Sequence, residues 1–143
     1  MIRTVLAVAV FAFGVTAVVA QGDPIAARKA VMKANGDQSK IATDMLEGKQ
    51  PFNLDAAKKI FATFAEAEKV RTLFPDSSKT GGDTAALPAI WENKADFEAK
   101  LTKLATESKA AGAATTNADT FKAQITEVRK NCGGCHQTYR KKT

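Results

Sequence analysis

The sequence contains very few of the residues that most often carry out chemistry. It has one histidine and two cysteines among 143 residues. A structural zinc site normally takes four Cys or His ligands, so the absence of a second Cys/His pair argues against one. No serine has a base close to it in sequence, and the single histidine is not paired with a nucleophile, so no catalytic constellation is indicated. We therefore expect the protein not to be an enzyme.

Strand-like alternation of apolar and polar residues is also missing, as are internal repeats and low-complexity segments. The excess of positive over negative charge is modest. Arg3 is the only charged residue among the first 20, so the rest of the chain has 20 basic against 15 acidic residues, a formal charge of +5. The lysines are scattered rather than clustered, which gives no indication of nucleic-acid binding. These absences favour an all-α domain that does not bind nucleic acid.

The N-terminal segment resembles a secretory signal. Arg3 precedes an apolar stretch, residues 5–19, and the small-x-small pattern before Gln21 predicts cleavage after Ala20. A retained membrane anchor is the alternative, but the apolar run is short for a span and no stop-transfer charges follow it. We expect residues 1–20 to be removed on export to the periplasm. The remaining 123 of the 143 residues, 21–143, form one domain with no stable membrane insertion.

All the histidine and cysteine of the chain lies in one short motif, Cys132-Gly133-Gly134-Cys135-His136. This C-x-x-C-H order is typical of covalent attachment of haem c, because two thiols three positions apart can each bond to a vinyl group of one porphyrin. The imidazole that follows can then bind the iron axially. A thioredoxin-like pair would require a βαβ pattern, which is absent. A haem-free bundle with a disulfide remains possible in an exported protein, although it leaves the adjacent histidine unexplained.

Apolar periodicity and helix-end signals predict four helices. Asp23 and Pro24 are suited to begin the first helix, Asn53 the second, and Pro75 to end the second. The expected helices cover about 25–48, 53–74, 93–111 and 118–140. The first has a possible disturbance at Asn35-Gly36, and Gly112 and the Thr115-Thr116-Asn117 cluster close the third. A long loop, 76–89, precedes the third, and its length suggests that it covers something. The pattern predicts an antiparallel up-down-up-down four-helix bundle.

The last helix places the haem motif on its apolar face. Six positions recur at spacings of 4, 3, 4, 3 and 4: Phe121, Ile125, Val128, Cys132, Cys135 and Tyr139. Because positions three and four apart share one face of a helix, the cysteines continue the inward stripe. Gly133 and Gly134 each cost about 1 kcal/mol of helix propensity, which close approach of the porphyrin would explain. The haem is therefore expected inside the bundle.

Several motifs in a fixed order resemble one family. They are Arg28 with Met32 four residues later, Lys49-Gln50-Pro51-Phe52, Leu73-Phe74-Pro75, Ile90-Trp91, and the haem motif with Tyr139-Arg140 behind it. This arrangement, with the haem motif in the last helix, resembles the class II c-type cytochromes, the cytochrome c′ family. The resemblance implies that Cys132 and Cys135 hold one haem c through thioethers and that His136 is the proximal iron ligand.

The same resemblance suggests roles for three further residues. Arg28 would lie near a haem propionate, and Arg140, one turn past His136, would flank the proximal face. Trp91 would either pack against the haem edge or simply anchor the core, and a single tryptophan favours the second interpretation.

The family divides by what faces the iron from the first helix. In the low-spin branch a methionine supplies the sixth ligand and the protein transfers electrons; in the other branch the iron is five-coordinate and binds NO or CO. Met32 occupies the relevant position, and residues 31–36 and 73–77 are more similar to the low-spin branch. Met32 could instead fill the core, in which case Met45 is the fallback ligand. We expect an electron carrier with His136 and Met32 on iron, whose partners are other periplasmic redox proteins. A gas-binding protein is the alternative, and monomer and homodimer both remain open.

Overall fold

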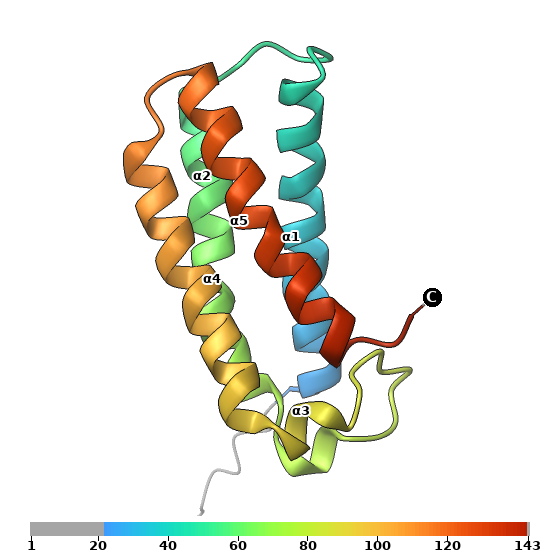
Figure 1. Ribbon diagram of the computed structural model, residues 1–143. Helices are drawn as coiled ribbons and strands as arrows, with labels where there is room; N and C mark the ends of the chain where they lie inside the picture. Colours follow the sequence, from blue (N-terminus) through green and yellow to red (C-terminus); the bar gives the residue numbers. More distant parts are fainter. Residues whose placement is uncertain (1–21, 143) are drawn as a thin grey trace, which may run out of the picture.

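The structure, a computed structural model, describes residues 22–142, and the expected signal segment 1–20 lies outside these residues. Four long helices lie side by side as the predicted bundle (Figure 1): α1 (Pro24–Leu46), α2 (Leu54–Ala65), α4 (Lys94–Ala114) and α5 (Ala118–Tyr139). Three short helices occupy the connection between α2 and α4: η1 (Glu66–Leu73), η2 (Asp76–Ser78) and α3 (Ala89–Glu92). Within residues 22–142 none of these helices combines the length and apolarity needed to cross a membrane.

The helix ends follow the predicted local signals. The Asp23 carboxylate accepts a hydrogen bond from the Ile25 amide at 2.8 Å, with Pro24 in the first helical position. The Asn53 side chain caps α2, and Asn117 forms a capping box at the start of α5. Gly48 follows α1 with a φ of 70°, a conformation that glycine adopts without strain. The predicted start of each of these helices is confirmed within one residue.

Two details of the first half of the chain differ from the prediction. The helix α1 runs without interruption through Asn35 and Gly36, because its packing on α2 outweighs their low helix propensity. The second predicted helix is α-helical only to Ala65 and continues as the 3₁₀-helix η1. Ala67 and Val70 are both buried, and their spacing of three matches the three-residue turn of a 3₁₀-helix.

Gly112 does not end the third long helix, which continues to Ala114. A Cβ atom at Gly112 would come within 3.3 Å of the Cβ atom of Phe61 on α2. The two helices approach closely here, so an added Cβ would require Phe61 to shift by a few tenths of an ångström. Gly112 is therefore not the helix stop, and α4 ends directly before the expected Thr115-Thr116-Asn117 cluster. Thr115, fully buried, follows the end of α4 in an extended conformation instead.

The core is divided into two clusters along the bundle. The first lies toward the α1–α2 and α4–α5 connections, and the second lies near η1 and the long loop. The buried members of the first are Ala42, Ala57, Ile60, Phe61, Phe64, Ala111, Phe121, Ile125 and Val128. Those of the second are Ala67, Val70, Phe74, Ile90, Phe97, Leu101 and Tyr139.

The apolar stripe of α5 runs through both clusters. Phe121, Ile125 and Val128 belong to the first and Tyr139 to the second. Cys132 and Cys135 lie between them and are only half-buried. The inward direction of the stripe is therefore confirmed, and its partly exposed section coincides with the haem motif.

Candidate haem-binding site

A cavity of about 570 Å³ lies where the stripe is partly exposed. Its walls come from α1, η1, α4 and α5, together with the loop that precedes α3. Most of the lining is apolar, which suits a flat aromatic cofactor. Among residues 22–142 no acidic side chain lines the cavity, whereas five basic ones do: Arg28, Lys29, Lys33, Lys100 and Arg140. Such a lining is complementary to a group that is apolar in the middle and carries carboxylates at its edge.

The α5 wall carries the three residues of the C-x-x-C-H motif that have reactive side chains. Cys132, Cys135 and His136 all line the cavity, and both cysteines are free thiols. Burial raises the pKa of each thiol. Burial, and then the positive charge of Arg140, lowers the pKa of His136 and so favours the neutral imidazole, the form that binds metals.

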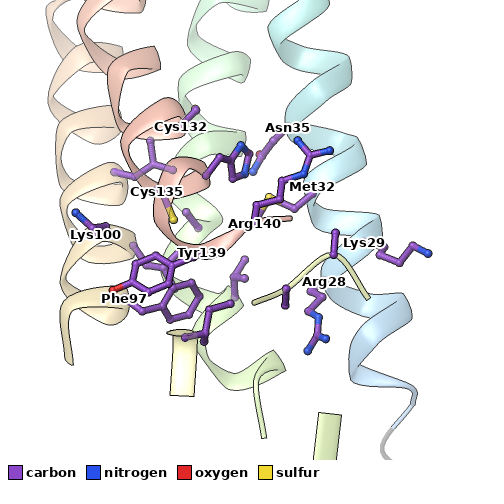
Figure 2. A pocket seen from close by; sticks show the side chains of 18 of the residues that line it. Arg28, Lys29, Met32, Asn35, Phe97, Lys100, Cys132, Cys135, Tyr139 and Arg140 are labelled. Carbon is purple, nitrogen blue, oxygen red and sulfur yellow. The ribbon is translucent and has the colours of Figure 1, made fainter. Parts of the chain in front are cut away.

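The α1 wall faces this motif with Met32 and Asn35 (Figure 2). The Met32 side chain is 39% exposed, so the thioether is not held in the packed core. Met45 packs against the first core cluster and does not line the cavity. Of the two candidate ligands, only Met32 is placed to reach a group bound against α5.

Asn35 lines the cavity from α1 and has a buried side-chain oxygen. Its Oδ1 atom is buried and has no hydrogen-bond partner among the described residues. Buried polar atoms of native proteins are nearly always paired, and this oxygen needs a hydrogen-bond donor, which an ionised haem carboxylate does not supply. The half-buried thiols and the basic lining together fit a covalently attached haem.

Arg28 is more deeply engaged than its expected role implies. Its guanidinium donates four hydrogen bonds, to the Leu73 carbonyl, to the hydroxyl and carbonyl of Ser78, and to the Thr84 hydroxyl. In Figure 2 it points away from the two cysteines. All four terminal N–H groups are thus used, and only the Nε–H is left for a propionate. Contact of Arg28 with a propionate stays a prediction, but its main partners are in the loop.

Arg140 and Trp91 lie differently with respect to the cavity. Arg140 is exposed, lines the cavity and follows His136 by one helical turn, as expected. Trp91 is not among the lining residues. Its indole donates a hydrogen bond to the Phe74 carbonyl at 3.1 Å and packs edge-on against the Phe74 ring. This location favours core anchoring over a haem contact.

Comparisons with known proteins agree with this geometry. The family model described as Cytochrome C' matches residues 23–140. The chain belongs to the cytochrome c′ family. Haem c is the cofactor of this family, and Cys132 and Cys135 are the two cysteines available for its attachment.

Individual cytochromes show how broad the similarity is. The chain is 44% identical to cytochrome c' of Rhodopseudomonas palustris over 87% of its own length and 86% of that protein. It is 38% identical to cytochrome c-556 of Agrobacterium fabrum, over 88% of this chain and 86% of that one. A solved structure of cytochrome c' from Rhodopseudomonas palustris superposes with a TM-score of 0.83 at 43% identity and covers 86% of this chain and 99% of its own. The predicted bundle fold and the covalent haem cofactor are therefore confirmed. The general function is confirmed as well: the protein is a single-haem cytochrome that transfers electrons or binds gas.

Sequence reasoning missed three residues of this region. Asn35 was considered only as a helix breaker, although it follows Met32 by three positions and so shares its face of α1. Lys100 lines the cavity from α4, and its salt bridge of 3.8 Å to Asp96 could have been inferred from the i, i+4 spacing. Arg129, two turns before His136 on α5, gave no local signal because its partners lie 86 and 90 residues away.

Proposed function

We propose that this cytochrome is a periplasmic electron carrier whose haem iron is bound by His136 on one side and Met32 on the other. The observation that supports it is the placement of the Met32 side chain. It lies exposed on the cavity wall opposite the C-x-x-C-H motif, whereas a core-filling methionine would be packed as Met45 is. Relatives named cytochrome c' and cytochrome c-556 both match most of the chain, the latter at 38% identity over 88% of it, so the similarity does not decide what faces the iron from α1.

The residues would divide the work as follows. Cys132 and Cys135 would hold the cofactor on α5, and the neutral His136 imidazole would bind the iron through the lone pair of its unprotonated nitrogen. Met32 closes the opposite side and excludes water and gases. The bound haem supplies a one-electron iron couple, and a His/Met ligand pair raises its reduction potential. Keeping both ligands in both oxidation states limits reorganisation, which favours rapid electron transfer.

The absorption spectrum of the reduced protein, recorded with and without CO, tests this proposal. We expect sharp low-spin bands that CO does not change. Met32→Leu keeps the apolar volume but removes the sulfur ligand, so we expect it to create a CO-reactive five-coordinate haem. Met45→Leu is the matched control and leaves the spectrum unchanged, because Met45 packs away from the cavity.

A wild-type protein whose reduced spectrum is broad, high-spin and shifted by CO would rule out the Met32 ligand. One observation favours that alternative, a five-coordinate protein that binds NO or CO. The relative with 44% identity is named cytochrome c'. In that case Met32 packs over an open iron without bonding to it.

We further propose that residues 1–20 are removed on export and that 21–143 is the haem domain. The partner would then be another redox protein of the periplasm. The mass of the denatured protein should equal residues 21–143 plus one haem. This measurement also excludes the haem-free disulfide form, which would show the mass of the chain alone.

A further inference from the structure

The two walls that carry Met32 and His136 are not held together by extensive helix packing. The helix α1 packs mainly on α2 and η1, and α5 packs mainly on α4. The cavity lies along the seam between α1 and α5. Whatever fixes the separation of these two helices therefore fixes the separation of the two candidate iron ligands.

On one side of the cavity the seam is bridged by the segment 73–87, and Arg28 holds this segment to α1. The Arg28 side chain is 5% exposed. It donates to the Leu73 carbonyl at 3.1 Å, to the Ser78 hydroxyl and carbonyl at 2.9 and 3.0 Å, and to the Thr84 hydroxyl at 2.6 Å. Its guanidinium also stacks 4.7 Å from the centre of the Phe74 ring. Burial lowers the pKa of Arg28, and the Asp23 carboxylate opposes this shift, but the side chain remains charged.

The same segment is bonded to the end of α5. The Leu87 amide donates to the Tyr139 carbonyl at 3.0 Å, and the Lys141 amide donates to the Ala85 carbonyl at 2.8 Å. The Lys141 ammonium adds a bond of 3.0 Å to the Thr84 carbonyl. Tyr139 is three residues past His136, so these bonds connect the segment to the turn that follows the haem motif.

On the other side of the cavity a second arginine bridges the seam directly. Arg129 of α5 donates to the Ser39 carbonyl and, at 3.0 Å, to the Thr43 hydroxyl of α1. Arg28 lies one turn before Met32 and Ser39 two turns after it, so the two bridges enclose Met32.

We propose that Arg28 and Arg129 are positioning residues for the iron site: they brace α1 against the haem-bearing helix and set the distance between Met32 and His136. The proposal rests on the proposed function, since it concerns how Met32 is held at the iron. A guanidinium that bonds several carbonyls and hydroxyls at once fixes geometry in a way that a single ammonium cannot. Losing a brace should loosen the seam and leave the haem attached.

The experiment compares Arg28→Lys, Arg28→Gln and Arg129→Gln with Arg71→Gln, all as haem-loaded protein. Arg71 is an exposed arginine on η1 that is paired with Glu68 and does not line the cavity, so it controls for charge removal. Two quantities are measured: the fraction of reduced haem that binds CO, and the hydrogen-exchange rates of the Leu87 and Lys141 amides.

We expect both Arg28 variants to raise these exchange rates by about tenfold or more, as loss of several hydrogen bonds should. We also expect both, and Arg129→Gln, to raise the CO-reactive fraction, whereas Arg71→Gln changes nothing. Agreement between Arg28→Lys and Arg28→Gln shows that geometry rather than charge is responsible. Helix content measured by circular dichroism identifies any variant that fails to fold. If Arg28→Gln fails, the results for Arg28→Lys and Arg129→Gln decide whether the proposal holds.

Folded variants with wild-type exchange rates and CO reactivity would overturn the proposal. Failure of the proposed function looks different, because the wild-type haem then binds CO completely. In that case the positioning role of the arginines is tested by the CO association rate and by amide exchange. Faster CO association and faster exchange in the Arg28 variants support this role, and unchanged rates rule it out.

Discussion

Tyr139 shows how a single side chain ties the haem-bearing helix to its neighbour. It is buried beside Phe97, and its hydroxyl donates a hydrogen bond to the Asp96 carboxylate of α4. Burial, and then this hydrogen bond and the Asp96 charge, raises the pKa of Tyr139 to about 12. The neutral phenol is therefore the form that the fold stabilises.

We expect the only tyrosine of the chain to titrate near 12 in the folded protein and near 10 in denaturant. Because the folded pKa is the higher one, the stabilisation is complete below about pH 10 and is lost as the pH rises toward 12. Carbon-13 NMR of the Tyr139 ring in the reduced protein measures the midpoint. Asp96→Asn should lower it, and a folded midpoint near 10 would contradict the assignment.

At the same scale, the sequence predicted some roles better than others. The chemistry of the haem motif could be predicted because it lies within five consecutive residues, whereas Met32 was identified from the resemblance to the family and not from spacing. The partners of Arg28 could not be predicted, because Leu73, Ser78 and Thr84 lie in the connection between α2 and α4, 45 to 56 residues away. Local patterns carry no information about such contacts.

Among the elements, α4 and α5 contain glycines that differ in how closely another helix packs against them. Gly133 and Gly134 are exposed and do not line the cavity. A Cβ atom added at either position would have no protein atom packed within 4 Å of it. No protein atom therefore requires glycine at either position. Gly112 on α4 lies against Phe61 and has no such space.

We expect Gly133→Ala and Gly134→Ala each to raise the free energy of unfolding by about 1 kcal/mol through helix propensity. Gly112→Ala should give no gain, because the clash with Phe61 offsets the same propensity term. Denaturant unfolding of the haem-loaded variants measures all three. Equal stabilisation by Gly112→Ala would show that the α2–α4 contact can relax.

Helix existence was predictable and helix interiors were less so. Caps such as Asp23 and Asn53 act through bonds to amides two or three residues away, so the sequence displays them directly. The change from α-helix to η1 at Glu66 depends on how Ala67 and Val70 pack into the second core cluster. Tertiary packing of this kind overrides propensity and has no local signature.

At the scale of the whole molecule, the candidate haem cavity interrupts the core on one side of the bundle. The first cluster is closed by direct contact among its own side chains, whereas the second borders the cavity of about 570 Å³. An empty apolar cavity of that size leaves its lining without packing partners. The two halves should therefore depend on the cofactor to different extents.

We expect a Cys132→Ala/Cys135→Ala protein prepared without haem to keep amide protection in α2 and the first half of α5. Protection should be lost in η1 and in the last turns of α5, where the cavity replaces direct packing. Hydrogen exchange detected by mass spectrometry resolves these segments. Uniform loss of protection would mean that the bundle folds as one unit with its cofactor.

The placement of the haem motif and Met32 on different helices has a consequence for how new activities can arise in this scaffold. The two cysteines available for haem attachment lie on α5, and under the proposed function the sixth ligand lies about a hundred positions earlier, on α1. Variation at position 32 can therefore be selected without risking loss of the haem. A library randomised at position 32 would sample electron carriers, gas-binding proteins and haem proteins with a vacant iron position, all with the same fold.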